Sequence, residues 1–273
     1  MPVTAKERAR IARHAPSETV QGDMMYFNPG RFSISTAIVD GARRFSRKAP
    51  YVLLGIPDAL MVVVVAYALA QLIRFVKTGA PVFPGTPWIA SIPLLLLSFF
   101  VYFTFISAPI GSYYKSRLSG IEYSGVIKSM ASSLTVLQPI GYTLMLALIA
   151  IMAEINALGW LSATVALLSI VFYFISINQS MLPQFLADTG GSRSNAVSHG
   201  WLLLSNSSLK VVSVNLVIFS PLIVLLAAFF LYQNMYVLAA AFPVFLISEG
   251  VWYCATASIH DAVVKGTNTY KIY

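Results

Sequence analysis

The chain has 273 residues, of which 58% are hydrophobic and only 10% are charged, and its net charge is +8 at pH 7. A soluble fold of this length could not cover so much apolar side chain with so few charges. Continuous apolar runs such as residues 62–70 exclude the alternating strands of a membrane barrel. The single cysteine, Cys254, excludes a disulfide framework and a thiolate metal site.

Residues 1–50 are polar and basic, and we expect a cytoplasmic N-terminal arm that ends in an amphipathic helix. No apolar core follows Met1, so we expect no cleaved signal peptide. Ile34, Ile38 and Phe45 share one face of this helix, and its basic face would lie among lipid headgroups. The alternative is an elbow that only sets the angle of the next helix. The candidate membrane-surface residues are Arg43, Arg44, Arg47 and Lys48.

Six apolar stretches follow, and each is predicted to be a helix because unpaired backbone groups cost several kcal/mol in lipid. A helix needs about 20 apolar residues to cross roughly 30 Å of hydrocarbon, a length that all but the third stretch reach clearly. The predicted fold is an all-α polytopic membrane bundle, in which Pro221 and Pro243 would kink the last two spans. The spans are 51–73, 88–110, 137–153, 158–182, 209–231 and 235–259, forming a transmembrane domain (51–259) before a cytoplasmic tail (260–273).

The basic residues are distributed unevenly between the two sides of this bundle. Sixteen of the 18 lysines and arginines lie on the side of the N-terminal arm, and only Arg74 and Lys77 lie on the other side. The positive-inside rule therefore predicts a multi-pass protein of the inner (plasma) membrane with both termini in the cytoplasm. The basic excess indicates topology and attraction to anionic lipid headgroups rather than nucleic-acid binding.

A short pattern precedes the first, third and fifth spans: a small residue, an aliphatic residue, and a second small residue three positions further on. The second small residues are Gly41, Ser129 and Gly200, which would allow close approach to a neighbouring helix. We interpret the pattern as three repeats of an amphipathic elbow helix plus a helical hairpin. Chance similarity among apolar helices is the alternative.

The third elbow, Ala196-Val197-x-x-Gly200, resembles the one found in bacterial six-span membrane families related to the membrane domain of some glycerophosphodiesterases. The other two elbows match less well, and the similarity covers most of the chain after Phe32. The resemblance implies a bacterial inner-membrane bundle. It implies no activity, because those families are largely uncharacterised and no phosphodiesterase domain accompanies the elbows here.

No catalytic, cofactor or metal constellation is found, since the histidines His14, His199 and His260 are isolated and the familiar catalytic motifs are absent from the sequence. Intramembrane polar residues are the better candidates, because a charge within a span is expected to face protein or water. Glu249 would lie roughly 15 Å deep and Asp58 roughly 10 Å deep. The set that could line an inward-facing polar cavity is Glu249, Asp58, Asn215, Asn178 and Gln179.

The alternative to a cavity is a protonated Glu249 that is hydrogen-bonded to a neighbouring helix, with Asp58 acting as a helix cap. No lysine or arginine is expected at a matching depth, so the sequence does not predict a buried salt bridge. Two functions follow from these features. The first is a non-enzymatic membrane scaffold or assembly subunit of a larger complex, with protein partners or further copies of itself. The second is a transporter or channel for a small solute or lipid, and an intramembrane enzyme is a distant third.

Overall fold

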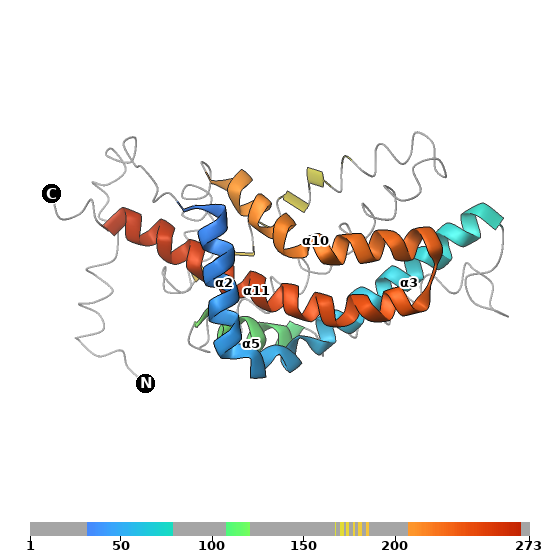
Figure 1. Cartoon of the computed structure of the whole chain (residues 1–273), viewed down its shortest axis with the longest axis horizontal. Helices are drawn as coiled ribbons and strands as arrows, with labels where there is room; N and C mark the ends of the chain where they lie inside the picture. The colour runs from blue at the N-terminus through green and yellow to red at the C-terminus, as the bar shows by residue number, and fades with distance from the viewer. Residues whose placement is uncertain are drawn as a thin grey trace.

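The computed structural model describes residues 32–78, 108–120 and 207–268, together with residues 167, 170, 171, 173, 174, 177, 180, 181, 184 and 185. The described segments are helical (Figure 1). The N-terminal arm up to residue 31 and the second and third elbows lie outside the described residues. So do most of the predicted spans 88–110, 137–153 and 158–182, and the threefold repeat therefore stays a prediction.

The first described helix is the predicted amphipathic one. Helix α2 (Ile34–Lys48) packs Ile34, Ile38 and Phe45 against the core, which confirms the apolar face expected from the sequence. It ends where Pro50 enters the chain, because proline has no N–H to continue the α-helical hydrogen bonds. Residues Ala49–Gly55 then form the 3₁₀ helix η3, and α3 (Ile56–Thr78) begins only after it. The predicted span 51–73 is thus displaced by about five residues.

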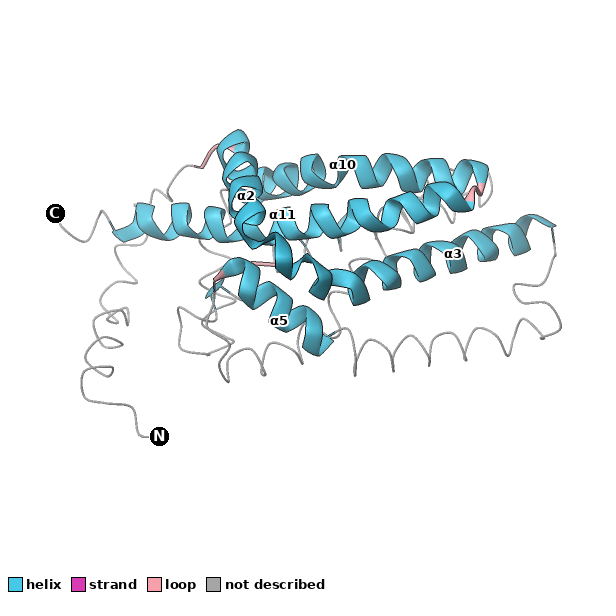
Figure 2. Cartoon of the chain, turned by 60° about the horizontal axis from the view of Figure 1, so that its bottom comes forward, coloured by secondary structure: helices cyan, strands magenta, loops and turns pink. Residues whose placement is uncertain are grey.

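Two long helices form an antiparallel hairpin at the other end of the chain (Figures 1 and 2). Helix α10 (Ser208–Tyr232) agrees with the predicted span 209–231, and α11 (Met235–Asn268) contains the predicted span 235–259. The turn between them is tight: Gln233 has a φ of 50° and donates its N–H to the Phe229 carbonyl at 2.7 Å. Helix α11 continues past residue 259, the predicted end of the span, because no proline interrupts the residues that follow.

Within the described residues, three helical segments are long and apolar enough to cross a membrane: Ile34–Gln71, Ser208–Tyr232 and Met235–Val263. These segments confirm the prediction of a helical membrane protein, but not the number of six spans. Pro221 and Pro243 lie inside α10 and α11 as expected. In Figure 1 the first part of α10 is inclined to the rest of the helix, as expected where a proline interrupts the backbone hydrogen bonds.

Helix α2 lies across α11 in both views, at a steep angle (Figures 1 and 2). Small residues make this crossing close. A Cβ atom at Gly41 would lie 2.8 Å from the Cβ of Ala255, and the Phe45 ring covers Gly250. The prediction that Gly41 permits close helix approach is confirmed. Helix α5 (Ala108–Ser119) packs against η3 and α11, so that α11 contacts α2, α3, α5 and α10.

Candidate functional site

A buried cluster of ionisable side chains forms where three helices meet, and we call Asp58, Lys115 and Glu249 the buried charge cluster. Asp58 comes from the first turn of α3, Lys115 from α5 and Glu249 from the middle of α11. The three residues are exposed by 1%, 7% and 0%, respectively. Charged residues are almost never buried to this extent unless they are paired, so their surroundings decide what the cluster can do.

Glu249 is held within the packing of three elements. Its Oε1 accepts a hydrogen bond of 2.9 Å from the hydroxyl of Tyr253, one helical turn further along α11. Its Oε2 lies against Gly55 of η3, where a Cβ atom would be only 3.2 Å from this oxygen and 2.9 Å from the Tyr114 ring. Glycine at position 55 therefore lets the carboxylate approach the backbone of η3 closely.

Asp58 is equally enclosed. Its Oδ2 would be 3.1 Å from a Cβ atom at Gly111, so the carboxylate lies directly against the backbone of α5. It belongs to the first turn of α3, where the helix dipole and the backbone N–H groups favour a negative charge. Asp58 is thus buried in the first turn of α3, and α5 covers it.

Lys115 is the member of the cluster that the sequence did not predict. Its Nζ lies 5.0 Å from the centre of the Tyr253 ring, within the range of a cation–π interaction. Burial lowers the pKa of this lysine, and the carboxylates of Asp58 and Glu249 act in the opposite direction. A lysine therefore does act electrostatically on both carboxylates, contrary to the expectation that none would lie at a matching depth.

Lys115 follows residue 110, the predicted end of the second span, where a basic residue is expected at the cytoplasmic surface. Helix α5 turns this segment back against η3 and α11, which brings the lysine inside. The signal in the sequence was Tyr113-Tyr114 immediately before the lysine, an aromatic pair that is unusual for a solvated loop. Tyr114 is fully buried and its ring meets the Tyr253 ring edge-on, with 5.8 Å between ring centres.

Tyr114 completes the polar surroundings of the cluster. Burial raises the pKa of its hydroxyl above the usual value, and the nearby Glu249, Cys254 and Asp58 raise it further. The hydroxyl stays neutral, and within the part of the chain that the structure describes it has no hydrogen-bond partner. The cluster thus combines two carboxylates, one lysine and two tyrosines, groups that can exchange protons or fix helices to one another.

The remaining predicted cavity residues are not brought to this cluster. Asn215 is buried, and its Oδ1 accepts a hydrogen bond of 2.6 Å from the hydroxyl of Tyr173. That bond joins α10 to a segment far away in the sequence, as polar side chains commonly do between membrane helices. Asn178 and Gln179 lie outside the described residues. The cavity predicted from the five residues is therefore represented only by Asp58 and Glu249, both enclosed.

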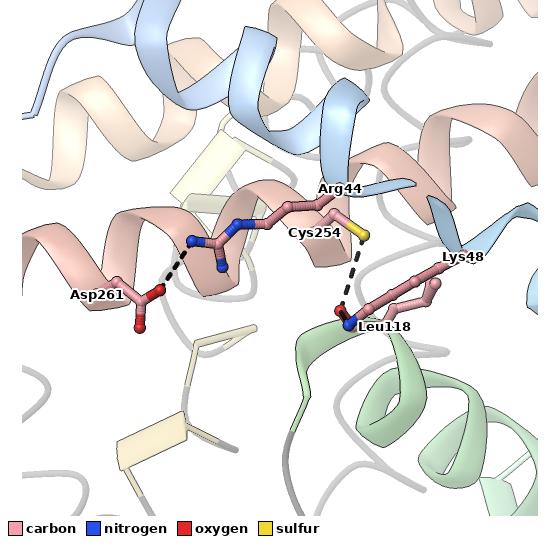
Figure 3. A network of polar contacts seen from close by, with 5 residues as sticks. All are labelled: Arg44, Lys48, Leu118, Cys254 and Asp261. Carbon is pink, nitrogen blue, oxygen red and sulfur yellow. Dashed lines mark hydrogen bonds and ion pairs between the residues drawn. The ribbon is translucent and has the colours of Figure 1, made fainter. Parts of the chain in front are cut away.

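The four predicted membrane-surface residues fall into two pairs. Arg44 donates to Oδ2 of Asp261 on α11 at 2.8 Å, and Lys48 donates to the carbonyl of Leu118 on α5 at 2.7 Å (Figure 3). The Sγ of Cys254 lies 3.7 Å from the same carbonyl. These two basic residues hold α2 to α11 and α5. Arg43 and Arg47, in contrast, are exposed on α2.

The adjacent residues His260 and Asp261 have different neighbours. Asp261 pairs with Arg44, and the His260 ring lies against Phe185 with 5.1 Å between ring centres. A groove of about 400 Å³ runs between α2 and the end of α11, with Asp40, Arg44 and Asp261 among its lining residues. Glu249 and Asp58 are not part of it. In the described ranges no group of three or more metal-ligating side chains is found.

The chain matches no family model, no curated protein and no solved structure.

Proposed function

We propose that this protein is a non-enzymatic scaffold or assembly subunit of a larger membrane complex, of the secretion or export type. The observation that carries the proposal is the enclosure of Glu249, which has no exposed surface and is engaged by Tyr253 and the backbone of η3. A transport site would have to admit its solute to the intramembrane carboxylate. A carboxylate that is enclosed between α11 and η3 suits a rigid framework better.

The length of α11 also supports this role. Its 34 residues extend for about 51 Å at 1.5 Å per residue, whereas the hydrocarbon layer is about 30 Å thick. The final turns therefore project beyond the bilayer, where α2 and the Arg44–Asp261 pair brace them. We place this end in the cytoplasm of a cell whose inner membrane holds the protein, because the positive-inside rule puts the basic side there. A projecting helix and a basic arm offer surface to a partner protein.

A transporter for a small solute or lipid is the second candidate, and one observation favours it. Lys115 lies buried near Asp58 and Glu249, and ionisable groups in this setting often serve proton relays in membrane transporters. Pro243, about two helical turns before Glu249, could provide the broken helix that such sites use.

The assembly role is tested by purifying the tagged full-length protein in a mild detergent, beside a variant that lacks residues 1–30. We expect stoichiometric companions with the full chain, and their loss from the shortened chain although it still inserts into the membrane. A homogeneous preparation of this chain alone, after cross-linking in intact membranes, would contradict the proposal. Companions that remain on the shortened chain would show that the arm acts only as a topology signal.

A labelling experiment separates the two candidates. In a Cys254→Ser background, we expect Glu249→Cys to resist a membrane-permeant maleimide in the folded protein, because the position is enclosed. Tyr236→Cys, at the exposed hairpin end of α11, is the positive control, because a maleimide reacts with the thiolate and therefore needs water at the site. Labelling of position 249 at a rate similar to that of position 236 would favour the transporter over the scaffold.

A further inference from the structure

Helix α2 has two faces with different chemistry. Ala37, Gly41 and Phe45 turn toward α11, whereas Val39, Arg43 and Arg47 are exposed. At 100° per residue the exposed residues 39, 43 and 47 lie roughly opposite residues 37, 41 and 45. We call Val39, Arg43 and Arg47 the outer stripe of α2. It points away from the helix bundle that α2 crosses.

Among the described residues, the arginines of the outer stripe make weaker contacts within the protein than the other two basic residues of α2. Arg44 and Lys48 on the same helix are tied to Asp261 and to the Leu118 carbonyl (Figure 3). Among the described residues, Arg43 pairs with Asp40, about one turn earlier in α2, at 3.9 Å, and its own side chain is 66% exposed. An exposed ion pair of this length is weak and is readily exchanged for another anion.

The level of α2 relative to the membrane follows from the residues along α11. At the hairpin end, Tyr232 and Tyr236 are 78% and 87% exposed, and tyrosines gather at the boundary between membrane and water. Helix α2 crosses α11 at Ala255, about 19 residues beyond Tyr236. At 1.5 Å per residue this is about 28 Å, close to the thickness of the hydrocarbon layer. Helix α2 therefore lies at the opposite boundary, among the headgroups.

We propose that the outer stripe of α2 binds the headgroups of anionic phospholipids, with Arg43 and Arg47 contacting the phosphates. Val39, which is 55% exposed, would lie toward the acyl chains beside them. Arginine suits this role because its planar guanidinium can donate two parallel hydrogen bonds to one phosphate. Such a lipid contact is compatible with a scaffold and with a transporter, and it assigns different tasks to basic residues that are neighbours in the sequence.

The proposal is tested by native mass spectrometry of the full-length protein titrated with phosphatidylglycerol in detergent micelles. We expect the Arg43→Gln/Arg47→Gln variant to raise the apparent Kd for the first bound phosphatidylglycerol by about 30-fold, given the usual contribution of each basic residue near an anionic surface. Binding of phosphatidylcholine should not change. Arg43→Lys/Arg47→Lys should retain most of the binding, because the charge is kept.

The matched control is Arg117→Gln/Lys210→Gln, which removes the same net charge but leaves α2 and its contacts intact. Lys210 is exposed on α10, and Arg117 is exposed on α5, where it donates a hydrogen bond to Tyr113 of the same helix. This control should bind phosphatidylglycerol as the unmodified protein does. The proposal is overturned if the control weakens binding as much as Arg43→Gln/Arg47→Gln does, since binding would then follow net charge alone. It is also overturned if Arg43→Gln/Arg47→Gln keeps its affinity while thermal unfolding shows it to be folded.

Discussion

Lys115→Met is the substitution that most directly tests the buried charge cluster. Methionine keeps most of the length of the side chain and removes the positive charge. Asp58 and Glu249 would then lose a cation that acts on both of them inside the protein. Neither carboxylate can turn to water instead, because their exposed fractions are 1% and 0%. We therefore expect a large loss of stability.

The size of this loss can be worked out from the environment of the lysine. Removing one partner of a buried ion pair costs about 3–5 kcal/mol, because the remaining charge is left uncompensated in a medium of low polarity. This range is the upper limit for Lys115, which acts on the two carboxylates through its charge. Lys115 is 7% exposed, so solvent screening reduces this value little. The cation–π contact with Tyr253 at 5.0 Å is lost as well, but the two effects share one charge and should not be added.

The assay is unfolding of the purified protein in mixed micelles with increasing sodium dodecyl sulfate, followed by tryptophan fluorescence. Trp252, one of the four tryptophans of the chain, is buried on α11 next to Tyr253 and contributes to this signal. Lys210→Met is the control, since Lys210 is exposed and its loss should change the free energy of unfolding by less than about 0.5 kcal/mol. Lys115→Met should exceed this control several-fold.

A double substitution shows whether the charge itself is responsible. Glu249→Gln removes one carboxylate charge and should make the additional loss of the lysine less costly. We expect the two substitutions to be coupled by about 0.5–3 kcal/mol, the range for residues in one network. The reasoning is refuted if Lys115→Met costs no more than Lys210→Met, or if the effects at positions 115 and 249 simply add.

Two further predictions concern contacts between the helices. Gly41→Leu should destabilise the protein by about 1–3 kcal/mol, because the new side chain has no room against α11, whereas Ala42→Leu on the exposed side of α2 should be nearly neutral in the same unfolding assay. Tyr173→Phe should cost roughly 0.6 kcal/mol, up to about 1.7, by removing the hydrogen bond to Asn215; an equal effect of Tyr173→Phe in the Asn215→Ala background would show that this bond is not the cause.

Much of the described fold could be predicted from the sequence because lipid imposes simple rules. Apolar length alone located α10 to within one residue at each end and the start of α11 at Met235. Helical periodicity identified the buried face of α2, and the small residue at Gly41 indicated where that face would meet another helix. These features depend on burial and side-chain size, which can be judged from neighbours in the sequence.

The parts that could not be predicted depend on contacts between distant segments. The sequence shows Lys115 as a basic residue after an apolar run, and only the packing of α5 against η3 and α11 makes it a buried one. The basic residues of α2 differ for the same reason. Arg44 and Lys48 are bonded to other helices, whereas Arg43 and Arg47 are exposed. All four are basic and adjacent in the sequence, but Asp261 and the Leu118 carbonyl are brought to only two of them by tertiary structure.

The buried charge cluster and the contact surface for α2 lie on the same short stretch of α11. Glu249 and Tyr253, one turn apart, face the buried charge cluster, whereas Gly250 and Ala255 on another side of the same turns receive α2. A helix is stiff over so short a length, so a shift of α11 at the cluster must also move the seat of α2. Disturbing Lys115 should therefore weaken lipid binding at the outer stripe, although no atom of Lys115 belongs to that stripe. Disturbing Arg43 or Arg47, which are exposed, should leave the cluster as it is.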